Sequence, residues 1–429
     1  MRIAYLNPSG QLGGAETSLR EMLASVRASA PDFDLWLILG QDGPLAKQAR
    51  DLGVQVVVED FPAVLARLGD SGNNNVLATL ASVGRASGQI FRYRRRLSAL
   101  LESIRPDIIH SNGLKMHVLG AMASRGSARL IWHIHDYVSA RRAMRHLLPR
   151  FRRACHRAIV NSNSVGEDFR RLLPGLKVTT IHNAVNVRQY SPDGPRLDLD
   201  RLAGLPPAGP GTLRVGLVAT FARWKGHLVF LEAVARVPSQ IPMRAYIVGG
   251  PIYQTDGSQW SLAELREQAE RLGLAGKVGF TGFVTDTAGA MRSLDVVVHA
   301  STQPEPFGMV IIEGMASGRP VIAAGAGGAR EIVADGITGL LHPSGDAAAL
   351  ARQMERLACD PSLRSKLGSA GRQAALQSYS SGRLAKELTG LYREVCDPCG
   401  RVAPACQALD SAREATAATA LEGACQRNP

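Results

Sequence analysis

Two glutamates, Glu305 and Glu313, stand eight positions apart on either side of a short apolar run in the sequence STQPEPFGMVIIEGMASGRPVIAA. Carboxylates accept hydrogen bonds from hydroxyl groups, so such a pair could hold the two ends of one polar ligand. In isolation, however, two glutamates near a helix start are more often partners of the helix dipole or solvated charges. The spacing alone does not distinguish these possibilities.

The residues around the pair predict a strand, a loop, a helix and a second strand. Residues 294–301 (LDVVVHAS) form a β-branched run typical of a buried strand, and the Gln-Pro-Glu-Pro that follows cannot continue it. Glu305 is therefore expected on a loop at a strand end, before a helix that starts from Gly308 and ends at Gly318. The start of that helix offers free backbone N–H groups to a phosphate, and Glu313 leans back toward the same end. A nucleotide sugar, with phosphate in its middle and hydroxyls at both ends, has the matching shape.

The composition predicts a folded protein of two or three domains. The chain has 429 residues, of which 45% are hydrophobic, 20% charged and 5% aromatic, with 44 glycines and 23 prolines, a balance that suits an α/β protein. The first residues lack the pattern of a signal peptide, and no run of eighteen apolar residues predicts a membrane span. Six scattered cysteines favour a reducing cytoplasm, and a net charge of +13 favours an anionic partner.

Strand-like and helical runs alternate along the chain, which predicts parallel sheets with helices on both faces. The Pro- and Gly-rich text over 191–212 reads as a linker between two such doubly wound halves that face a cleft. In chain order, we expect a first domain over 1–190, the linker, a second domain over 213–375, a helix over 376–395 that packs back on the first domain, and a flexible tail over 396–429. Four cysteines of that tail (Cys396, Cys399, Cys406 and Cys425) leave a zinc site as an alternative.

Four motifs combine with this organisation: GQLGGAE at 10–16, WHIHDY at 132–137, FARWKGH at 221–227 and EPFG at 305–308. Together they resemble a retaining glycosyltransferase of family 4, over about residues 1–392. The resemblance implies the GT-B fold, in which two Rossmann-like domains face a cleft. The first domain would bind the acceptor and the second the nucleotide sugar.

The resemblance also implies roles for individual residues. Glu305 would contact the transferred sugar near its anomeric carbon, Lys225 would grip the diphosphate, and His135 would face the sugar from the first domain. His133 points to the same face of its strand, but His135 stands nearer the strand end. The other residues implied in binding the sugar donor are Gly13 and Gly14 (diphosphate and acceptor), Phe283 and Val284 (base), Phe307, Gly308, Met309 and Val310 (backbone N–H groups) and Glu313 (ribose).

The sequence departs from the family pattern after the first strand of its second half. Family members commonly have Gly-Arg where this chain has Ala219 and Thr220. Arg223, two residues before Lys225, is the candidate replacement for the missing cation, which the departing diphosphate requires. The departure also supports an alternative of another class, a nucleotide-sugar-binding protein with the same fold and little or no turnover.

For the reaction, the resemblance implies hexosyl transfer with retention at the anomeric carbon, without a metal or other cofactor. Two mechanisms remain open: a front-face reaction in which the departing phosphate takes the acceptor's proton, and a double displacement with Glu305 as the nucleophile. A nucleic-acid partner is not expected, because aromatic residues are too scarce to interleave with the basic ones.

Basic residues concentrate in two segments of the first half. Residues 91–97 hold four arginines, and residues 137–158 hold seven without an acid. In the second segment, Met144, Leu147, Leu148 and Phe151 recur at helical spacing, as in basic helices that lie on anionic membranes, although a solvated helix would also fit. Peripheral contact with the inner face of the cell membrane would suit a lipid-linked acceptor in cell-surface polysaccharide assembly.

Overall fold

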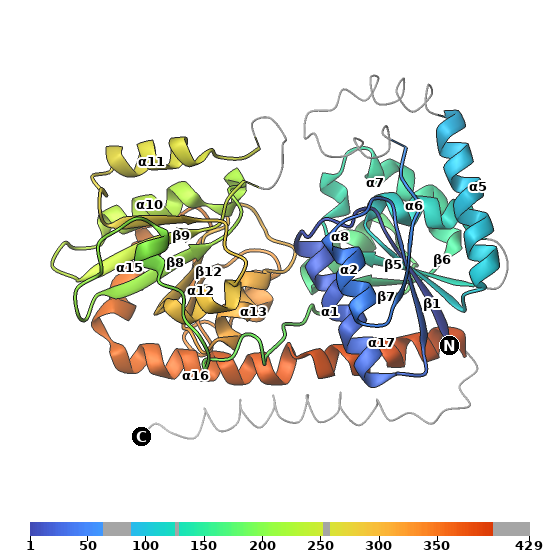
Figure 1. The fold of residues 1–429 in the computed structure, drawn as a ribbon. Helices are drawn as coiled ribbons and strands as arrows, with labels where there is room; N and C mark the ends of the chain where they lie inside the picture. Colours follow the sequence, from blue (N-terminus) through green and yellow to red (C-terminus); the bar gives the residue numbers. More distant parts are fainter. Residues whose placement is uncertain (63–86, 125–127, 252–257, 398–429) are drawn as a thin grey trace, which may run out of the picture.

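The computed structural model describes residues 1–62, 87–124, 128–251 and 258–397. Two lobes stand side by side, and the last helices run beneath both of them (Figure 1). The predicted tail lies outside the described residues from position 398 on, and with it Cys399, Cys406 and Cys425. Among the described helices, none combines the length and the apolar character needed to cross a membrane.

The first lobe is built on a seven-stranded parallel sheet with strand order β3-β2-β1-β4-β5-β6-β7. Its strands are β1 (Arg2–Asn7), β2 (Asp34–Leu39), β3 (Gln55–Val58), β4 (Ile108–Asn112), β5 (Arg129–Ile134), β6 (Cys155–Val160) and β7 (Val178–Thr180). Its helices are α1 (Gly14–Ser29), α2 (Pro44–Asp51), α5 (Ser87–Ile104), α6 (Leu114–Ala123), α7 (Met144–Leu147) and α8 (Asn163–Leu172), with the 3-10 turns η1 (Val138–Ala140) and η2 (Leu148–Ala154).

The second lobe repeats the design with a six-stranded parallel sheet in the order β10-β9-β8-β11-β12-β13. Its strands are β8 (Leu213–Val218), β9 (Met243–Val248), β10 (Val278–Gly282), β11 (Val296–His299), β12 (Val321–Ala324) and β13 (Leu340–His342). Its helices are α9 (Leu199–Leu202), α10 (His227–Arg236), α11 (Leu262–Arg271), α12 (Thr287–Ser293), α13 (Met309–Ala316), α14 (Ala329–Ile332), α15 (Ala347–Cys359) and α16 (Pro361–Ser378), with the 3-10 turn η3 (Arg223–Lys225).

Both sheets are buried on two faces, which explains why their strands are almost continuously apolar. Two doubly wound parallel sheets confirm the predicted fold class. In each sheet the strand order reverses once, between β1 and β4 in the first and between β8 and β11 in the second. Loops diverge at such a switch point and leave a crevice at the carboxyl ends of the strands, so these two places are where ligands are expected to bind.

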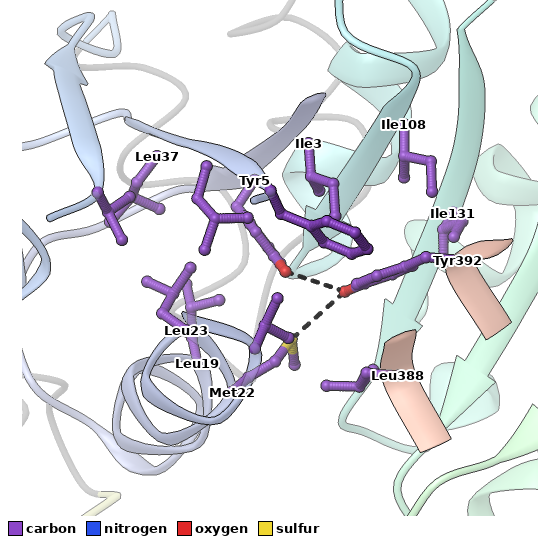
Figure 2. Close-up of a cluster of buried hydrophobic side chains, with 14 of the residues drawn as sticks. Ile3, Tyr5, Leu19, Met22, Leu23, Leu37, Ile108, Ile131, Leu388 and Tyr392 are labelled. Carbon is purple, nitrogen blue, oxygen red and sulfur yellow. Dashed lines mark hydrogen bonds between the residues drawn. The ribbon is translucent and has the colours of Figure 1, made fainter. Parts of the chain in front are cut away.

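The last helix, α17 (Ser381–Cys396), packs against α1 of the first lobe. Its buried Leu388 and Tyr392 enter the core formed by Tyr5, Leu19 and Met22, and the hydroxyls of Tyr5 and Tyr392 lie 3.1 Å apart (Figure 2). Each large apolar side chain buried in this way contributes about 1.5 to 3 kcal/mol. The end of the described chain is therefore fastened to its beginning.

The segment predicted as a linker, 191–212, is held against the second lobe. Buried Asp200 in α9 accepts hydrogen bonds from Arg214, Arg244 and the Tyr246 hydroxyl at 2.9, 2.6 and 2.6 Å. Burial opposes ionisation of Asp200, but these partners outweigh it and hold its pKa well below the ordinary value. The prolines and glycines of this segment thus mark irregular backbone, and Asp200 fixes that backbone to the second lobe.

Candidate active site

Glu305 lies in the loop after β11, and the residue is only 8% exposed. Lys225 Nζ donates to its Oε1 at 2.6 Å, while His299 Nε2 and Ser301 Oγ contact its Oε2 at 2.6 and 2.8 Å. Lys225 follows β8 and His299 ends β11, which are neighbours at the switch point of the second sheet. The topology therefore brings together residues that are 80 positions apart in the chain.

This cluster fixes the charge of Glu305. Burial by itself would raise the pKa of the carboxyl, but Lys225 and His299 outweigh it and hold the pKa well below its ordinary range. Glu305 is therefore ionised throughout the neutral range, with donors on both oxygens. Sequence reasoning missed His299 and Ser301, because a histidine in an apolar strand reads as a core residue.

Glu313 lies in a different environment, in a small pocket of about 30 Å³ between the two lobes. The pocket joins the start of α13 to Thr17 and Arg20 of α1 and to Tyr190 of the segment after β7. Burial raises the pKa of Glu313 to about 7, and the Tyr190 hydroxyl and Lys225 oppose this only in part. Tyr190, which sequence reasoning also missed, shares its hydroxyl with Thr287 at 2.6 Å.

Helix α13, which follows Glu305 and contains Glu313, begins where it was predicted. Gly308 precedes α13 with φ of +112°, a backbone conformation that side-chain-bearing residues rarely adopt. Met309 and Val310 then open the helix, with their backbone N–H groups at its positive end. Phe307 is 3% exposed and its ring packs 6.0 Å from that of Tyr379, so its side chain belongs to the core.

A second pocket, of about 150 Å³, opens at the carboxyl ends of β8 and β9. It is lined by apolar and small residues that come from three neighbouring strand ends: Val218, Ala219, Thr220, Val248, Gly249, Gly250, Phe283, Val284 and Thr287. The Phe283 ring is 67% exposed whereas Val284 is buried. Thr287 of this pocket hydrogen-bonds to Tyr190 of the Glu313 pocket, so the walls of the two pockets are in contact.

Arg223 is directed away from the Glu305 cluster. Its guanidinium lies 3.7 Å from the centre of the Trp260 ring and donates to Glu264 at 3.1 Å. Lys225, by contrast, binds Glu305. The structure thus brings Lys225 to the carboxylate and holds Arg223 against Trp260 and Glu264.

The first lobe contributes the loop after β5. Tyr137 Oη donates to the backbone carbonyl of Glu305 at 3.4 Å, so the loop that carries His135 meets the loop that carries Glu305. His135 Nε2 contacts Asn112 Oδ1, and its ring stacks on that of His133 at 4.1 Å. Burial lowers the pKa of His135 to about 4, which Asp136 opposes only in part, so the ring is neutral.

The paired glycines Gly13 and Gly14 stand at the start of α1. The Gly13 N–H donates to the carboxylate of Glu16 at 3.2 Å. A Cβ added at Gly14 would meet no heavy atom of its described surroundings within 4 Å. Pro8 and Ser9 precede this turn, so it lies at the carboxyl end of β1 and hence at the first sheet's switch point.

A further contact between the lobes involves Glu331 of α14. Its two carboxylate oxygens accept the backbone N–H groups of Asn163 and Ser164 at 2.8 and 2.7 Å, at the start of α8. His182 Nε2 lies 3.5 Å from the same carboxylate. Burial opposes ionisation, but these partners lower the pKa of Glu331 overall. The negative charge of Glu331 in the second lobe therefore stabilises the N-terminus of α8 in the first lobe.

Two lobes with facing switch points, one carrying a fixed carboxylate–lysine pair beside a helix N-terminus, define a glycosyltransferase of the GT-B class. The family described as Glycosyltransferase Family 4 matches residues 12–189, and the family described as Glycosyl transferases group 1 matches residues 212–360. The chain belongs to this family, the group 1 glycosyltransferases of family 4.

Solved structures show the same fold over nearly the whole chain. HepE of Anabaena in complex with UDP-glucose superposes with a TM-score of 0.74 at 26% identity, covering 92% of this chain and 100% of that one. Sucrose-phosphate synthase of Thermosynechococcus elongatus reaches 0.71 at 20% identity, covering 92% and 99%, which bears on the fold alone.

Relatives with known names match over shorter stretches. The lipopolysaccharide core biosynthesis glycosyltransferase LpsE of Rhizobium meliloti is 34% identical over 37% of this chain and 44% of its own length. The alpha-maltose-1-phosphate synthase of Mycobacterium tuberculosis is 31% identical over 57% of this chain and 64% of its own length. The chain thus spans less than two thirds of either relative.

Proposed function

We propose that this protein transfers a hexosyl group, with retention, from a nucleotide-diphosphate sugar to a carbohydrate acceptor. The observation that carries the proposal is the line of sites along the second sheet. It runs from the apolar pocket beside Phe283 and Val284, past Glu313 in α13, to the Glu305–Lys225 pair. A base, a ribose, a diphosphate and a sugar follow one another in the same order.

The donor we propose is a UDP-hexose. HepE, which shares the fold over the full length of both domains, has been solved with UDP, with UDP and glucose, and with UDP-glucose. Glu313 would accept the ribose hydroxyls, and Phe283, with its exposed ring, would cover the base. The backbone N–H groups of Met309 and Val310 would meet the diphosphate at the start of α13.

We further propose a front-face reaction in place of a double displacement. A nucleophilic carboxylate needs a free oxygen pointed at the anomeric carbon, yet both oxygens of Glu305 accept hydrogen bonds from Lys225, His299 and Ser301. Its depressed pKa also makes it a weak base. Glu305 would therefore stabilise the positive charge that develops on the sugar.

In this reaction the bond between the anomeric carbon and the phosphate oxygen breaks, and its electron pair stays with the diphosphate. The acceptor hydroxyl bonds to the anomeric carbon on the same face and gives its proton to the departing phosphate oxygen. Lys225 supplies positive charge beside the leaving group, together with the N-terminus of α13. No metal is required in this scheme, because the chain's own groups carry the charge.

The acceptor we propose is a lipid-linked or growing oligosaccharide of cell-surface polysaccharide assembly, in keeping with the name of LpsE. Arginines at 141, 142, 145, 150, 152 and 153 are exposed and would meet anionic lipids. Leu148 is fully buried, and Met144 and Phe151 pack on the first core, so the segment is not one amphipathic helix. Its contact with a membrane would therefore be electrostatic.

A second candidate is a protein that binds a nucleotide sugar without turnover. It is favoured by Thr220, which lines the apolar pocket where a cation is common in the family, and by the direction of Arg223 toward Glu264. Turnover of a radiolabelled sugar donor separates the two functions, because binding alone releases no nucleoside diphosphate.

The test is binding and hydrolysis across a panel of GDP-, UDP- and ADP-sugars, for the native protein and for Glu313→Ala. We expect one UDP-sugar to bind and to release UDP, and the variant to lose both properties. Binding without release would support the second candidate. If no member of the panel bound, the proposed function would be wrong.

A further inference from the structure

A chain of buried polar side chains crosses the carboxyl edge of the first sheet. The neighbouring strands β1 and β4 end in Asn7 and Asn112, both fully buried, and His135 follows the end of the next strand, β5. Asn112 Nδ2 donates to Asn7 Oδ1 at 2.6 Å, and Asn112 Oδ1 contacts His135 Nε2. Neither asparagine was a candidate in the sequence, because each lies at the end of an apolar strand.

The donors and acceptors along this row of side chains are fixed in one direction. Asn7 Nδ2 donates to the carbonyl of Ser9 at 2.5 Å, and a backbone carbonyl can only accept. Asn7 Oδ1 therefore faces Asn112 and accepts from its Nδ2. This leaves the Oδ1 of Asn112 toward His135, and since an amide oxygen also only accepts, the proton of the imidazole must be on Nε2.

The consequence concerns the other nitrogen of the ring. His135 is neutral near pH 7, because burial lowers its pKa to about 4. With the proton on Nε2, its Nδ1 carries a lone pair, and Nδ1 has no hydrogen-bond partner within the described ranges. At Nδ1, a neutral ring held in this way can accept a hydrogen bond from a hydroxyl but cannot donate one.

We propose that Asn112 is a positioning residue that, with Asn7 behind it, holds His135 as the Nε2–H tautomer and so presents Nδ1 to accept a sugar hydroxyl. Only the identity of that hydroxyl rests on the proposed function. Asn7 Nδ2 also lies 3.4 Å from Glu16, whose carboxylate accepts the Gly13 N–H. The chain thus joins His135 to the glycine turn on the same wall of the site.

The tautomer can be measured without any substrate. Two-bond 1H–15N correlation spectra of 15N-histidine-labelled protein report which ring nitrogen carries the proton, and the spectrum of His135→Asn identifies the signals of His135 among the ten histidines. We expect a protonated Nε2 in the native protein. In Asn112→Leu, which removes the accepting oxygen, we expect the Nδ1–H form to become at least as populated.

Asn7→Asp is the matched control, because it keeps an oxygen that accepts from Asn112 and should leave the tautomer of His135 unchanged. A native Nδ1–H tautomer, or an unchanged tautomer in Asn112→Leu, would overturn the proposal. If Asn112→Leu does not fold, Asn112→Asp replaces it. Its carboxylate should raise the pKa of His135 by at least one unit, and an unchanged pKa would contradict the contact.

Other titrating groups face the same ring and must be followed in that titration. Asp136 adjoins His135 in the chain, and His110, His117 and His133 interact with it from β4, α6 and β5. Burial lowers the pKa of all three histidines, so they stay neutral over the range in which a raised pKa of His135 would show.

A kinetic readout connects the tautomer to the proposed reaction. With UDP-glucose, we expect kcat of Asn112→Leu to fall about tenfold while KM changes little, since one hydrogen bond to the ring is lost. A protein that shows the Nε2–H tautomer but turns over no nucleotide sugar would contradict the proposed function and leave the positioning role intact. Equal kcat values despite a changed tautomer would overturn the role of Nδ1.

Discussion

The two sheets present opposite kinds of chemistry at their switch points. The first ends in neutral side chains, in which the amides of Asn7 and Asn112 lead to an uncharged His135. The second ends in charges, with ionised Glu305 held by Lys225. The same topology thus supports one neutral wall and one charged wall, because local side chains and not the sheet determine the electrostatics.

The comparison extends to the two carboxylates of the second lobe. Glu305 gains two oppositely charged or donating neighbours that outweigh its desolvation, whereas the partners of Glu313 offset its desolvation only in part. Their pKa values therefore move in opposite directions from the same starting value. A protein that binds a ligand through both has one carboxylate whose charge is permanent and one whose charge changes near neutral pH.

The largest effect is expected from Glu305→Gln, which removes the permanent charge of the second wall. We expect turnover of the sugar donor to fall at least about a hundredfold, because stabilisation of the developing charge is lost. The free energy of unfolding at pH 7 should fall by about 3 kcal/mol, since Lys225 is left partly buried without its partner. Steady-state kinetics and urea denaturation measure the two effects.

The difference in free energy of unfolding between the native protein and Glu305→Gln should depend on pH with a definite sign. The pKa of Glu305 is depressed in the folded protein, so its stabilising contribution is present above the unfolded value of 4.5 and is lost as the pH falls below it. The stability gap between native and variant should therefore narrow only under acid conditions. The double variant Glu305→Gln/Lys225→Met should recover stability but not turnover, and full activity in either variant would contradict the assigned role.

Glu313→Gln should have opposite effects on binding and on stability. We expect the affinity for the UDP-sugar to fall about tenfold, through loss of one charged hydrogen bond to the ribose. Because the pKa of Glu313 is raised from 4.5 to about 7, the native protein loses stability as the pH rises through that window. The variant should then be more stable than the native protein by about 3 kcal/mol above pH 7, and equally stable near pH 4.

Calorimetric titration with UDP and thermal unfolding between pH 4 and 8 measure these two effects of Glu313→Gln. A stability difference that stayed constant over this pH range would show that the pKa of Glu313 is not raised in the folded protein.

Glu331→Gln tests the contact between the two lobes. An amide cannot accept both N–H groups of α8 as a carboxylate does, so we expect a loss of about 1 kcal/mol in the free energy of unfolding. The lobes should also separate more, which would raise the radius of gyration in small-angle X-ray scattering. Glu167→Gln, at an exposed ion pair on the same helix, is the matched control and should change neither quantity.

The smallest effect is expected from Arg223→Ala. Arg223 is held by Trp260 and Glu264, so we expect the affinity for the UDP-sugar to change less than about threefold, as for other exposed ion pairs. Lys225→Ala, compared in the same titration, should weaken binding by more than tenfold. Equal losses would mean that Arg223 leaves Glu264 and replaces the cation missing at Thr220.

Much of the architecture could be predicted from the sequence. β-branched runs separated by helical periodicity located the strands of both sheets, and the Gly308 that precedes α13 marked where the helix begins. These features depend on neighbouring residues in the chain, which explains why they were accessible. The anchoring of 191–212 through Asp200 was not, because its partners Arg214, Arg244 and Tyr246 lie on strands whose order no local pattern specifies.

The site residues divide in the same way. The sequence by itself determined that carboxylates, a lysine and a histidine stand at strand ends, because the spacing of loops and helices is a local property. Only the tertiary structure decided which of them carry charge. Lys225 reaches Glu305, and Asn112 reaches both Asn7 and His135, through strands that pair side by side although long stretches of chain separate them. Burial and neighbours set each pKa and each tautomer, and both are products of that packing.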